Sequence, residues 1–214
     1  MRIPIAKDGY MFITPLVVFT WGVCALSWFW AAGFFGGLLL FVTWFFRDPE
    51  RVIPEDPNAI VSPGDGRIVE IVPEKDPLLE KDGYTRISVF LNVFNVHVNR
   101  VPIAGKIQAY RYNKGKFLNA SSHKASMDNE QSAILLNNGH VTILVKQIAG
   151  LIARRIVCWA KEGDEFQRGQ RYGLIRFGSR MDVFVPEGTE IKVAIGDIVS
   201  GGSSIIGYLK KYGT

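Results

Sequence analysis

Two glycine–serine pairs are the residues with which this chain could do chemistry on its own backbone. Gly178-Ser179 interrupts the strand-like stretch GLIRFGSRMDVF, and a second pair lies in GGSSII, residues 201–206. A glycine has no side chain to keep a neighbouring hydroxyl away from the glycine carbonyl, and it tolerates strained backbone angles. A β-bulge is the simpler explanation for a glycine inside a strand. The local pattern leaves both interpretations open.

Histidine and aspartate supply groups that could move protons. His97 lies in FLNVFNVHVNRVP in step with Asn95 and Asn99, and valines alternate with these three residues as in a strand. Such a polar stripe is either a solvent-exposed face or the wall of a site, and the pattern alone favours the exposed face. Asp65 lies in VSPGDGRIV, where Pro-Gly-Asp-Gly is typical of a tight turn. No metal-ligand cluster or phosphate-binding loop occurs in the sequence.

An uncharged apolar run precedes these residues. Between Met11 and Phe46 there is no Asp, Glu, Lys, Arg or His. As a single helix the run would be about 54 Å long, whereas a hydrocarbon core is about 30 Å thick. A helical hairpin fits better, and its turn is expected in WAAGFFGG, residues 30–37, where glycines loosen the helix. The run is too long for the apolar region of a cleavable signal peptide.

The charges beside the run predict its orientation. Arg2 and Lys7 precede it, and Arg47 and Arg51 follow it. The positive-inside rule then places both flanks, and the domain that follows, on the cytoplasmic side of the cell membrane. The two cysteines have neither CxxC nor zinc-ligand spacing, which agrees with a reducing compartment. The net charge of +5 suits an anionic lipid surface, and no nucleic-acid-binding signature is present.

The rest of the sequence predicts a mainly β protein. The segment RDPERVIPEDPNAIVSPGDG carries four prolines and is typical of an extended linker. Short β-rich runs follow it, separated by Gly, Asn, Asp and Pro at intervals typical of a sandwich or barrel. We therefore expect a membrane-anchoring hairpin with its linker at residues 1–51, and a single β-rich, sandwich- or barrel-like domain at residues 52–214.

Seven segments, in order along nearly the whole chain, resemble the short form of the phosphatidylserine decarboxylase family. They are FFRDPER, SPGDGRI, FNVHVNRVPIAGKI, KGKFLNA, MDNEQ, QIAGLIARRI and GLIRFGSRMDVFVP. The resemblance implies a pyruvoyl-dependent carboxy-lyase, made as a self-cleaving proenzyme, that converts phosphatidylserine to phosphatidylethanolamine at a membrane. A phospholipid is then the substrate.

By this resemblance the chain cleaves itself between Gly178 and Ser179. The products are a large chain, residues 1–178, and a small chain, residues 179–214, which remain together as a heterodimer. Ser179 becomes a pyruvoyl group that forms a Schiff base with the substrate amine, and no metal is implied. The GGSS segment resembles the family's closing turn, which disfavours cleavage at residues 203–204.

The resemblance also implies roles for other polar residues. His97 acts as a base or proton donor, and Asp65 orients His97 and stabilises its charged form. Longer members have a second histidine where this sequence has Arg100, which we expect to contact the lipid phosphate together with Asn99. Two alternatives stay open. One is a decarboxylase of another serine-headed lipid, such as archaetidylserine, and the other is a non-enzymatic, membrane-anchored β-sandwich adaptor.

Overall fold

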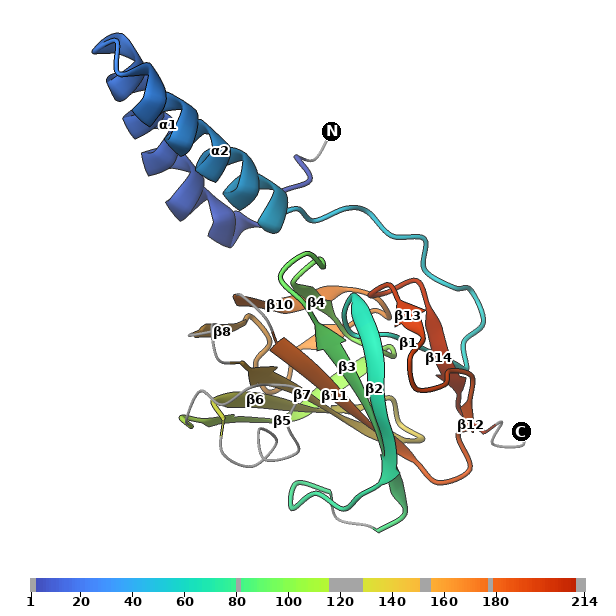
Figure 1. Cartoon of the computed structure of the whole chain (residues 1–214). Helices are drawn as coiled ribbons and strands as arrows, with labels where there is room; N and C mark the ends of the chain where they lie inside the picture. Colours follow the sequence, from blue (N-terminus) through green and yellow to red (C-terminus); the bar gives the residue numbers. More distant parts are fainter. Residues whose placement is uncertain (1–2, 80–81, 116–128, 151–154, 177–178, 211–214) are drawn as a thin grey trace. The chain divides into compact units, whose positions relative to one another are not determined.

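The first of two compact units in the chain is a pair of apolar helices. The computed structural model describes residues 3–79, 82–115, 129–150, 155–176 and 179–210, and the two units are Met1–Glu50 and Arg51–Thr214. In the first unit a 3-10 helix, Lys7–Gly9, leads into α1, Tyr10–Ala25, and α2 spans Phe29–Phe45 (Figure 1). The predicted pair of N-terminal helices is confirmed.

The reversal between the helices lies earlier than predicted. Ser27 N–H donates to the Cys24 carbonyl (2.9 Å) and Trp28 N–H donates to the Val23 carbonyl (3.0 Å). With Ser27 at φ 59°, this is the hydrogen-bond pattern of a Schellman cap. The prediction of a turn at residues 30–37 is wrong, because the three glycines of that segment lie inside α2. A glycine costs a helix only about 1 kcal/mol, which does not end it.

The two helices differ in length. The helical stretch Lys7–Ala25 is long and apolar enough to cross a membrane, judged by length and composition. The second helix, Phe29–Phe45, has 17 residues, which corresponds to about 25 Å and is shorter than a hydrocarbon core of about 30 Å. The first unit therefore consists of one arm of spanning length and one shorter arm.

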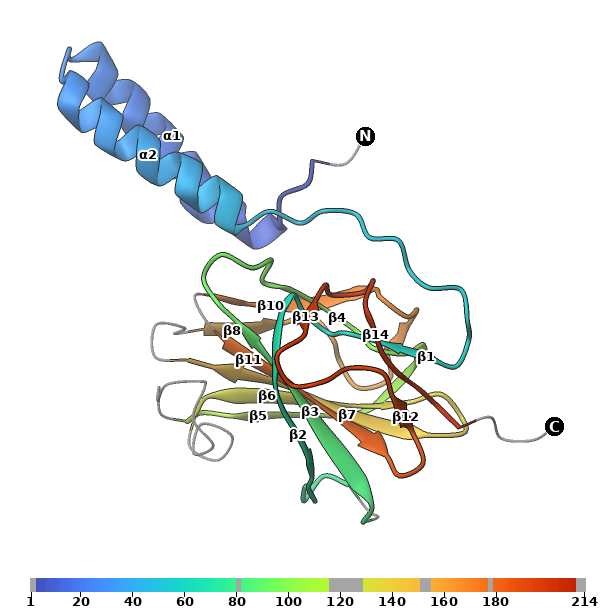
Figure 2. The same cartoon turned by 45° about the vertical axis from the view of Figure 1, so that its right-hand side comes forward.

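The second unit is built from antiparallel strands. They are β1 (Ala59–Val61), β2 (Gly66–Pro73), β3 (Tyr84–Leu91), β4 (Val98–Arg100), β5 (Gly105–Asn113), β6 (Gln131–Asn137), β7 (Thr142–Ala149), β8 (Arg155–Cys158), β9 (Glu165–Phe166), β10 (Arg171–Arg176), β11 (Ser179–Pro186), β12 (Glu190–Ile191), β13 (Ile198–Val199) and β14 (Ile205–Tyr208). Within the described residues they form an eight-stranded sheet, β13-β2-β3-β11-β7-β6-β5-β9, and two three-stranded sheets, β4-β10-β8 and β1-β14-β12 (Figures 1 and 2). The predicted β-rich domain is confirmed.

One hydrophobic core joins the three sheets. From β11 it takes Met181 and Val183, from β10 it takes Tyr172 and Ile175, and from β14 it takes Ile206. Successive residues of a strand point to opposite faces, so the alternate residues of β11 lie on the other side of the large sheet. We call the side of the large sheet that faces this core the inner face, and the opposite side the outer face.

The chain changes sheets between β10 and β11. β10 ends at Arg176 between β4 and β8, whereas β11 begins at Ser179 between β3 and β7 of the large sheet. Gly178, for which a bulge within one strand was the simpler explanation, lies outside the described residues. The described residues before and after it belong to different sheets.

Candidate active site

Ser179 lies at the start of β11 on the inner face of the large sheet. It pairs with Leu91 of β3 and with Ala149 of β7. Its side chain is fully buried, and its Oγ has no hydrogen-bond partner among the described residues. A large majority of buried polar side-chain atoms are hydrogen-bonded, so an exception needs an explanation. Gly178, the other half of the predicted cleavage pair, lies outside the described residues.

The second glycine–serine pair forms a hydrogen-bonded turn between β13 and β14. Ser203 N–H and Ser204 N–H both donate to the Ser200 carbonyl (3.1 and 2.9 Å). The Ser204 Oγ accepts from the Ser200 N–H (2.9 Å), and Gly202 adopts a left-handed φ of 80°. Gly202 and the Ser204 hydroxyl therefore help to close a turn, as the resemblance implied.

His97 lies at the base of the loop between β3 and β4. It is only 2% exposed, so the expectation that this stripe is a solvent-exposed face is wrong. Its Nδ1 lies 2.9 Å from the Asn95 carbonyl. A carbonyl oxygen can only accept, so Nδ1 carries the proton, and in the neutral ring the lone pair is on Nε2. With Nδ1 as the donor, Nε2 is the ring nitrogen of this buried histidine that can accept a proton.

Asp65 makes its described hydrogen bonds with partners other than His97. Its carboxylate accepts two hydrogen bonds from Arg51 Nη2 (3.0 and 2.8 Å), and one from the Gly201 N–H (2.7 Å). The expected hydrogen bond to His97 is therefore not made within the described part of the chain. Asp65 instead joins the linker, the turn before β2 and the turn after β13. The acceptor that fixes the His97 ring is a backbone carbonyl.

Asn99 and Gln147 form a buried amide pair that links two sheets. Gln147 Nε2 donates to Asn99 Oδ1 at 2.8 Å, and both residues are fully buried. Gln147 pairs with Met181, which places it diagonally from Ser179 across two adjacent strands, at about 7–8 Å between Cα atoms. The Asn99 Nδ2 donor and the Gln147 Oε1 acceptor have no partner among the residues that the structure describes. Gln147 therefore lies on the same face as Ser179, on a neighbouring strand, and both side chains have a polar atom without a partner among the described residues.

Sequence reasoning missed Gln147, although a signal existed. The other inner-face residues of β7 are Ile143, Val145 and Ala149, all in the hydrophobic core. In TILVKQIA, Gln147 takes the one polar place in a series of alternate residues that are otherwise apolar. Such an amide indicates a polar group that enters the core.

Arg100 lies in the same wall. It is 5% exposed, and its Nη1 donates to the Gly169 carbonyl at 2.9 Å. Its Cδ packs against Gly202, where an added Cβ would come within 2.8 Å. The guanidinium therefore braces the loop before β10 and the turn after β13.

Burial raises the pKa of one hydroxyl group and one thiol group elsewhere in the core. The Tyr172 hydroxyl has its pKa raised well above the usual value, and the Cys158 thiol has its pKa raised, in both cases chiefly by desolvation. Tyr172 Oη has no hydrogen-bond partner among the described residues. Both groups are therefore neutral at physiological pH.

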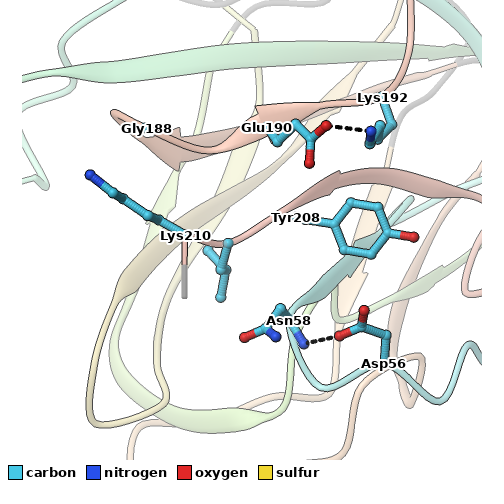
Figure 3. Close-up of a pocket in the computed structure, with 8 residues that line it drawn as sticks. Asp56, Asn58, Gly188, Glu190, Lys192, Tyr208 and Lys210 are labelled. Atoms are coloured by element: carbon cyan, nitrogen blue, oxygen red, sulfur yellow. Dashed lines mark hydrogen bonds and ion pairs between the residues drawn. The ribbon is translucent and has the colours of Figure 1, made fainter. Parts of the chain in front are cut away.

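A surface pocket of about 470 Å³ lies at the other end of β11 (Figure 3). Its walls include Glu190, Lys192 and Tyr208. Gly188 in this pocket follows Pro186, the last residue of β11, so the pocket is about 24 Å along the strand from Ser179. It contains none of the predicted site residues.

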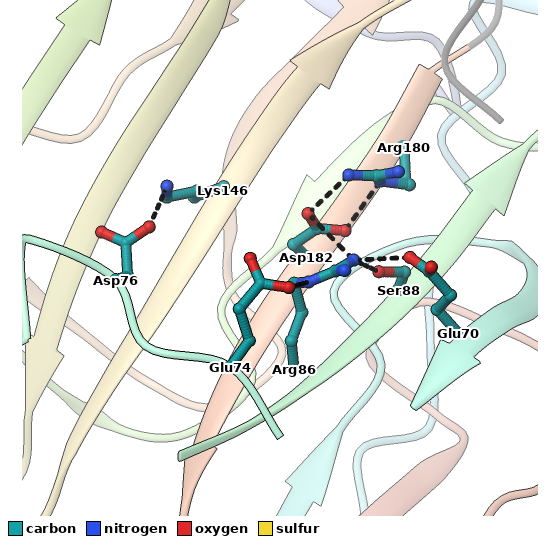
Figure 4. A network of polar contacts seen from close by, with 8 residues as sticks. All are labelled: Glu70, Glu74, Asp76, Arg86, Ser88, Lys146, Arg180 and Asp182. Atoms are coloured by element: carbon teal, nitrogen blue, oxygen red, sulfur yellow. Dashed lines mark hydrogen bonds and ion pairs between the residues drawn. The ribbon is translucent and has the colours of Figure 1, made fainter. Parts of the chain in front are cut away.

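The outer face of β11 carries a buried cluster of charges (Figure 4). Arg180 Nη2 donates to Asp182 Oδ2 at 3.0 Å. Arg86 of β3 donates to Glu74 (2.7 Å) and Glu70 (2.8 Å), and lies 3.7 Å from Asp182. Burial opposes the charge on Arg86, but these carboxylates outweigh it and raise the pKa of the guanidinium. Each charge on this face is matched by an opposite one.

Comparisons with known proteins identify the chain's family. Residues 38–207 match the family model described as phosphatidylserine decarboxylase. The chain is 46% identical over 212 residues to a phosphatidylserine decarboxylase proenzyme from Geobacter metallireducens, covering 96% of this chain and 97% of the relative. It is 47% identical over 208 residues to the proenzyme from Syntrophotalea carbinolica, covering 97% of each.

These matches define the class of the chain as a pyruvoyl-dependent carboxy-lyase made as a proenzyme. The chain belongs to the phosphatidylserine decarboxylase family. Among the described residues, no three or more His, Cys, Asp or Glu side chains lie together in a group that could bind a metal ion.

Proposed function

We infer that the chain converts phosphatidylserine to phosphatidylethanolamine, with a pyruvoyl group made from Ser179. The observation that carries this inference is the buried Oγ of Ser179, which has no partner in the described part of the chain and lies at the start of β11 in a member of this family. A hydroxyl that is desolvated and not hydrogen-bonded costs stability. The cost is explained if the group reacts.

Self-processing begins at the peptide bond before Ser179. Its Oγ attacks the Gly178 carbonyl carbon, and the amide becomes an ester while the Ser179 nitrogen becomes an amine. Removal of the Ser179 α-proton then expels the Gly178 carboxylate, which keeps the former Oγ. Tautomerisation and addition of water release ammonia and leave a ketone at the start of the small chain. The step needs a base that accepts and returns protons, which is the role we assign to His97 Nε2.

The surroundings of Ser179 fit the group that this reaction makes. The pyruvoyl group supplies an electron-withdrawing carbonyl that binds the substrate amine and stabilises negative charge when carbon dioxide leaves. Asn99 Nδ2, buried and without a partner among the described residues, is the donor that we assign to the substrate head group. Gln147 holds the Asn99 amide with its oxygen turned toward Gln147, so that the Asn99 NH₂ group remains for the substrate.

Arg100 and Asp65 act through other residues in this proposal. Arg100 braces the wall that carries Asn99, because its buried Nη1 donates to the Gly169 carbonyl. Asp65 stabilises the turn at Gly201 and holds Arg51 in place.

The two chains remain joined after cleavage because β11 is a central strand of the large sheet. It pairs with β3 from Ser179 to Pro186 and with β7 from Ser179 to Phe184. The small chain thus begins inside the large sheet, with ladder hydrogen bonds on both sides.

The first unit anchors the protein in the membrane with both flanks cytoplasmic. This proposal rests on the apolar helices α1 and α2 and on the basic residues beside them, Arg2, Lys7 and Arg47. Deletion of residues 1–46 should release the β-rich unit from membranes, while cleavage at residue 179 should continue, because the helices supply no catalytic group. Membrane retention of the deleted protein as firm as that of the full chain would contradict the anchoring role.

The experiment that tests the function is turnover of carboxyl-labelled phosphatidylserine by purified, cleaved protein. We expect labelled carbon dioxide and phosphatidylethanolamine in equal amounts, and inhibition by hydroxylamine, which reacts with ketones. An ether-linked serine lipid in a parallel reaction tests the archaetidylserine alternative. A stable, uncleaved chain without turnover of either lipid would instead support the adaptor alternative.

A further inference from the structure

The loop between β3 and β4 connects the site to the surface of the second unit. His97, at the base of the loop, is 2% exposed, whereas Phe94, at its tip, is 65% exposed. The loop begins directly after Leu91, which pairs with Ser179. A large aromatic ring is therefore presented to the outside by the same short segment that supplies the proposed base.

Hydrogen bonds within the loop hold Phe94 in this position. Phe94 N–H donates to Asn92 Oδ1 (2.8 Å), and Asn92 N–H donates to Asn95 Oδ1 (2.9 Å). Asn95 N–H also donates to the Asn92 carbonyl (3.0 Å). His97 Nδ1 then bonds to the Asn95 carbonyl. The tip of the loop is thus a braced turn, mechanically linked to the His97 ring.

Two more exposed apolar side chains lie at the same end of the sheet. Ile195 is 64% exposed and Ile198 is 75% exposed. Ile198 pairs with Arg67, and Arg67 pairs with Phe90 near the end of β3, which places Ile198 about 10 Å from the end of β3. Figures 1 and 2 both show β13 and the loop after β3 at this end of the unit.

The opposite end of the large sheet has a different surface. The turn between β6 and β7 exposes Asn138, Gly139 and His140, which are polar or small. At the Ser179 end, by contrast, Arg67 is exposed and pairs with Ile198, and its Nη1 donates to the Gly196 carbonyl at 3.0 Å. An apolar rim with a cation matches a bilayer that contains anionic lipid.

We propose that Phe94, Ile195 and Ile198 form a membrane-docking edge, with Arg67 facing anionic head groups. The edge inserts at the lipid surface and brings the head group of a bilayer lipid to the site beside Ser179, while the acyl chains stay in the bilayer. The docking edge is separate from the anchor in the first unit. The anchor keeps the protein at the membrane, and the docking edge holds the Ser179 site against the lipid surface. The proposal rests on the proposed function, since that function makes the substrate a phospholipid.

The first experiment compares two forms of the substrate with full-length, cleaved protein. Phe94→Ser and Ile198→Ser should each lower turnover of long-chain phosphatidylserine in phosphatidylcholine vesicles by about tenfold, the effect of one lost apolar insertion. Turnover of dihexanoyl phosphatidylserine, kept below its micellar concentration, should be unchanged. Trp159→Ser is the matched control, because Trp159 is 40% exposed and follows β8, whose last residue pairs with Gly173 at the end of β10 away from Ser179, and it should affect neither substrate.

Equal losses on vesicle and soluble substrate, or no loss on vesicles, would overturn the docking edge. In both cases self-cleavage and turnover of the soluble lipid would still show whether the proposed function holds, so the two failures are distinguishable.

A second experiment reports insertion directly. Phe94→Cys, in a background with Cys24→Ser and Cys158→Ala, carries an environment-sensitive fluorophore, and Lys106→Cys at the other end of β5 is its control. We expect a blue shift at position 94, and none at position 106, when anionic vesicles are present. A shift at position 94 that follows protein concentration in detergent, without lipid, would assign the edge to a second copy of the chain and overturn the proposal.

Discussion

Both faces of β11 bury polar residues. The charged side chains on the outer face form ion pairs, whereas several polar atoms on the inner face have no partner among the described residues. On the outer face, Asp182 forms an ion pair with Arg180 and lies 3.7 Å from Arg86, although Arg86 Nη2 has no hydrogen-bond partner among the described residues. On the inner face, Ser179 Oγ and the Asn99 and Gln147 amides keep atoms that no described residue satisfies. Paired buried charges hold a structure together, while unpaired buried dipoles cost stability and are kept where they have another use. The strand therefore carries its scaffold on one side and its chemistry on the other.

The largest expected effect on the inner side is that of His97→Ala. General acid–base help is worth about 10²–10⁴-fold, so self-cleavage should slow from minutes to hours or stop, with the thermal midpoint little changed. Asp65→Asn should slow cleavage less, because Asp65 acts on the Gly201 turn and not on the ring. A gel time course of cleavage after refolding measures both rates. Normal cleavage in His97→Ala with lost cleavage in Arg100→Ala would show that the base is misassigned.

The matching change on the outer face is Asp182→Ala, which should affect stability and not chemistry. It removes the carboxylate that pairs with Arg180 and faces Arg86, and breaking a buried ion pair costs about 3–5 kcal/mol. Denaturant unfolding of the cleaved protein should show this loss, while any folded protein should still be cleaved at residue 179. Unchanged stability in Asp182→Ala would mean that the ion cluster does not support the strand.

A smaller effect is expected from Gln147→Leu, which keeps the side-chain volume but removes the amide that fixes Asn99. The KM for soluble short-chain phosphatidylserine should rise by about tenfold, the effect of one lost hydrogen bond of about 1.4 kcal/mol. Cleavage should proceed at the normal rate, since Gln147 takes no part in it. A loss of stability without a change in KM would make the residue purely structural.

The smallest effect is expected from Tyr172→Phe, which removes an inner-side hydroxyl that has no assigned use. Stability at pH 7 should stay within about 1 kcal/mol of the parent, because the hydroxyl has no partner to lose among the described residues. Burial raises the pKa of Tyr172, so its contribution is present below about pH 10 and is lost as the pH rises toward the folded-state pKa. The parent should therefore lose stability more steeply than Tyr172→Phe above about pH 10, as measured by urea unfolding at each pH.

Features that depend on local composition were predictable from the sequence. The uncharged run predicted the helical pair, and the runs with alternating apolar residues predicted the β-rich unit. Both patterns indicate which side chains are kept away from water. Ser179 could be preferred over the second pair only through a family resemblance. Its burial without a hydrogen-bond partner depends on β3 and β7, which lie far from it in sequence.

Features that depend on long-range contacts were not predictable. One partner of Asp65 is Gly201, 136 positions away, and no local pattern encodes that hydrogen bond. Gln147 reaches the inner face only through the register of β7 with β11. The helix reversal at Ser27 was missed for another reason, since a serine at positive φ is uncommon and glycines were available nearby.

Mass spectrometry of the purified protein tests the central claim most directly. We predict two chains, residues 1–178 and 179–214, with the small chain beginning in a ketone that borohydride reduces and that lacks a free amine. The Ser179→Ala variant should remain a single chain, and Ser203→Ala should be cleaved normally. A small chain that begins with an unmodified serine, or a cut beside residue 203, would contradict the assignment of Ser179 as the source of the pyruvoyl group.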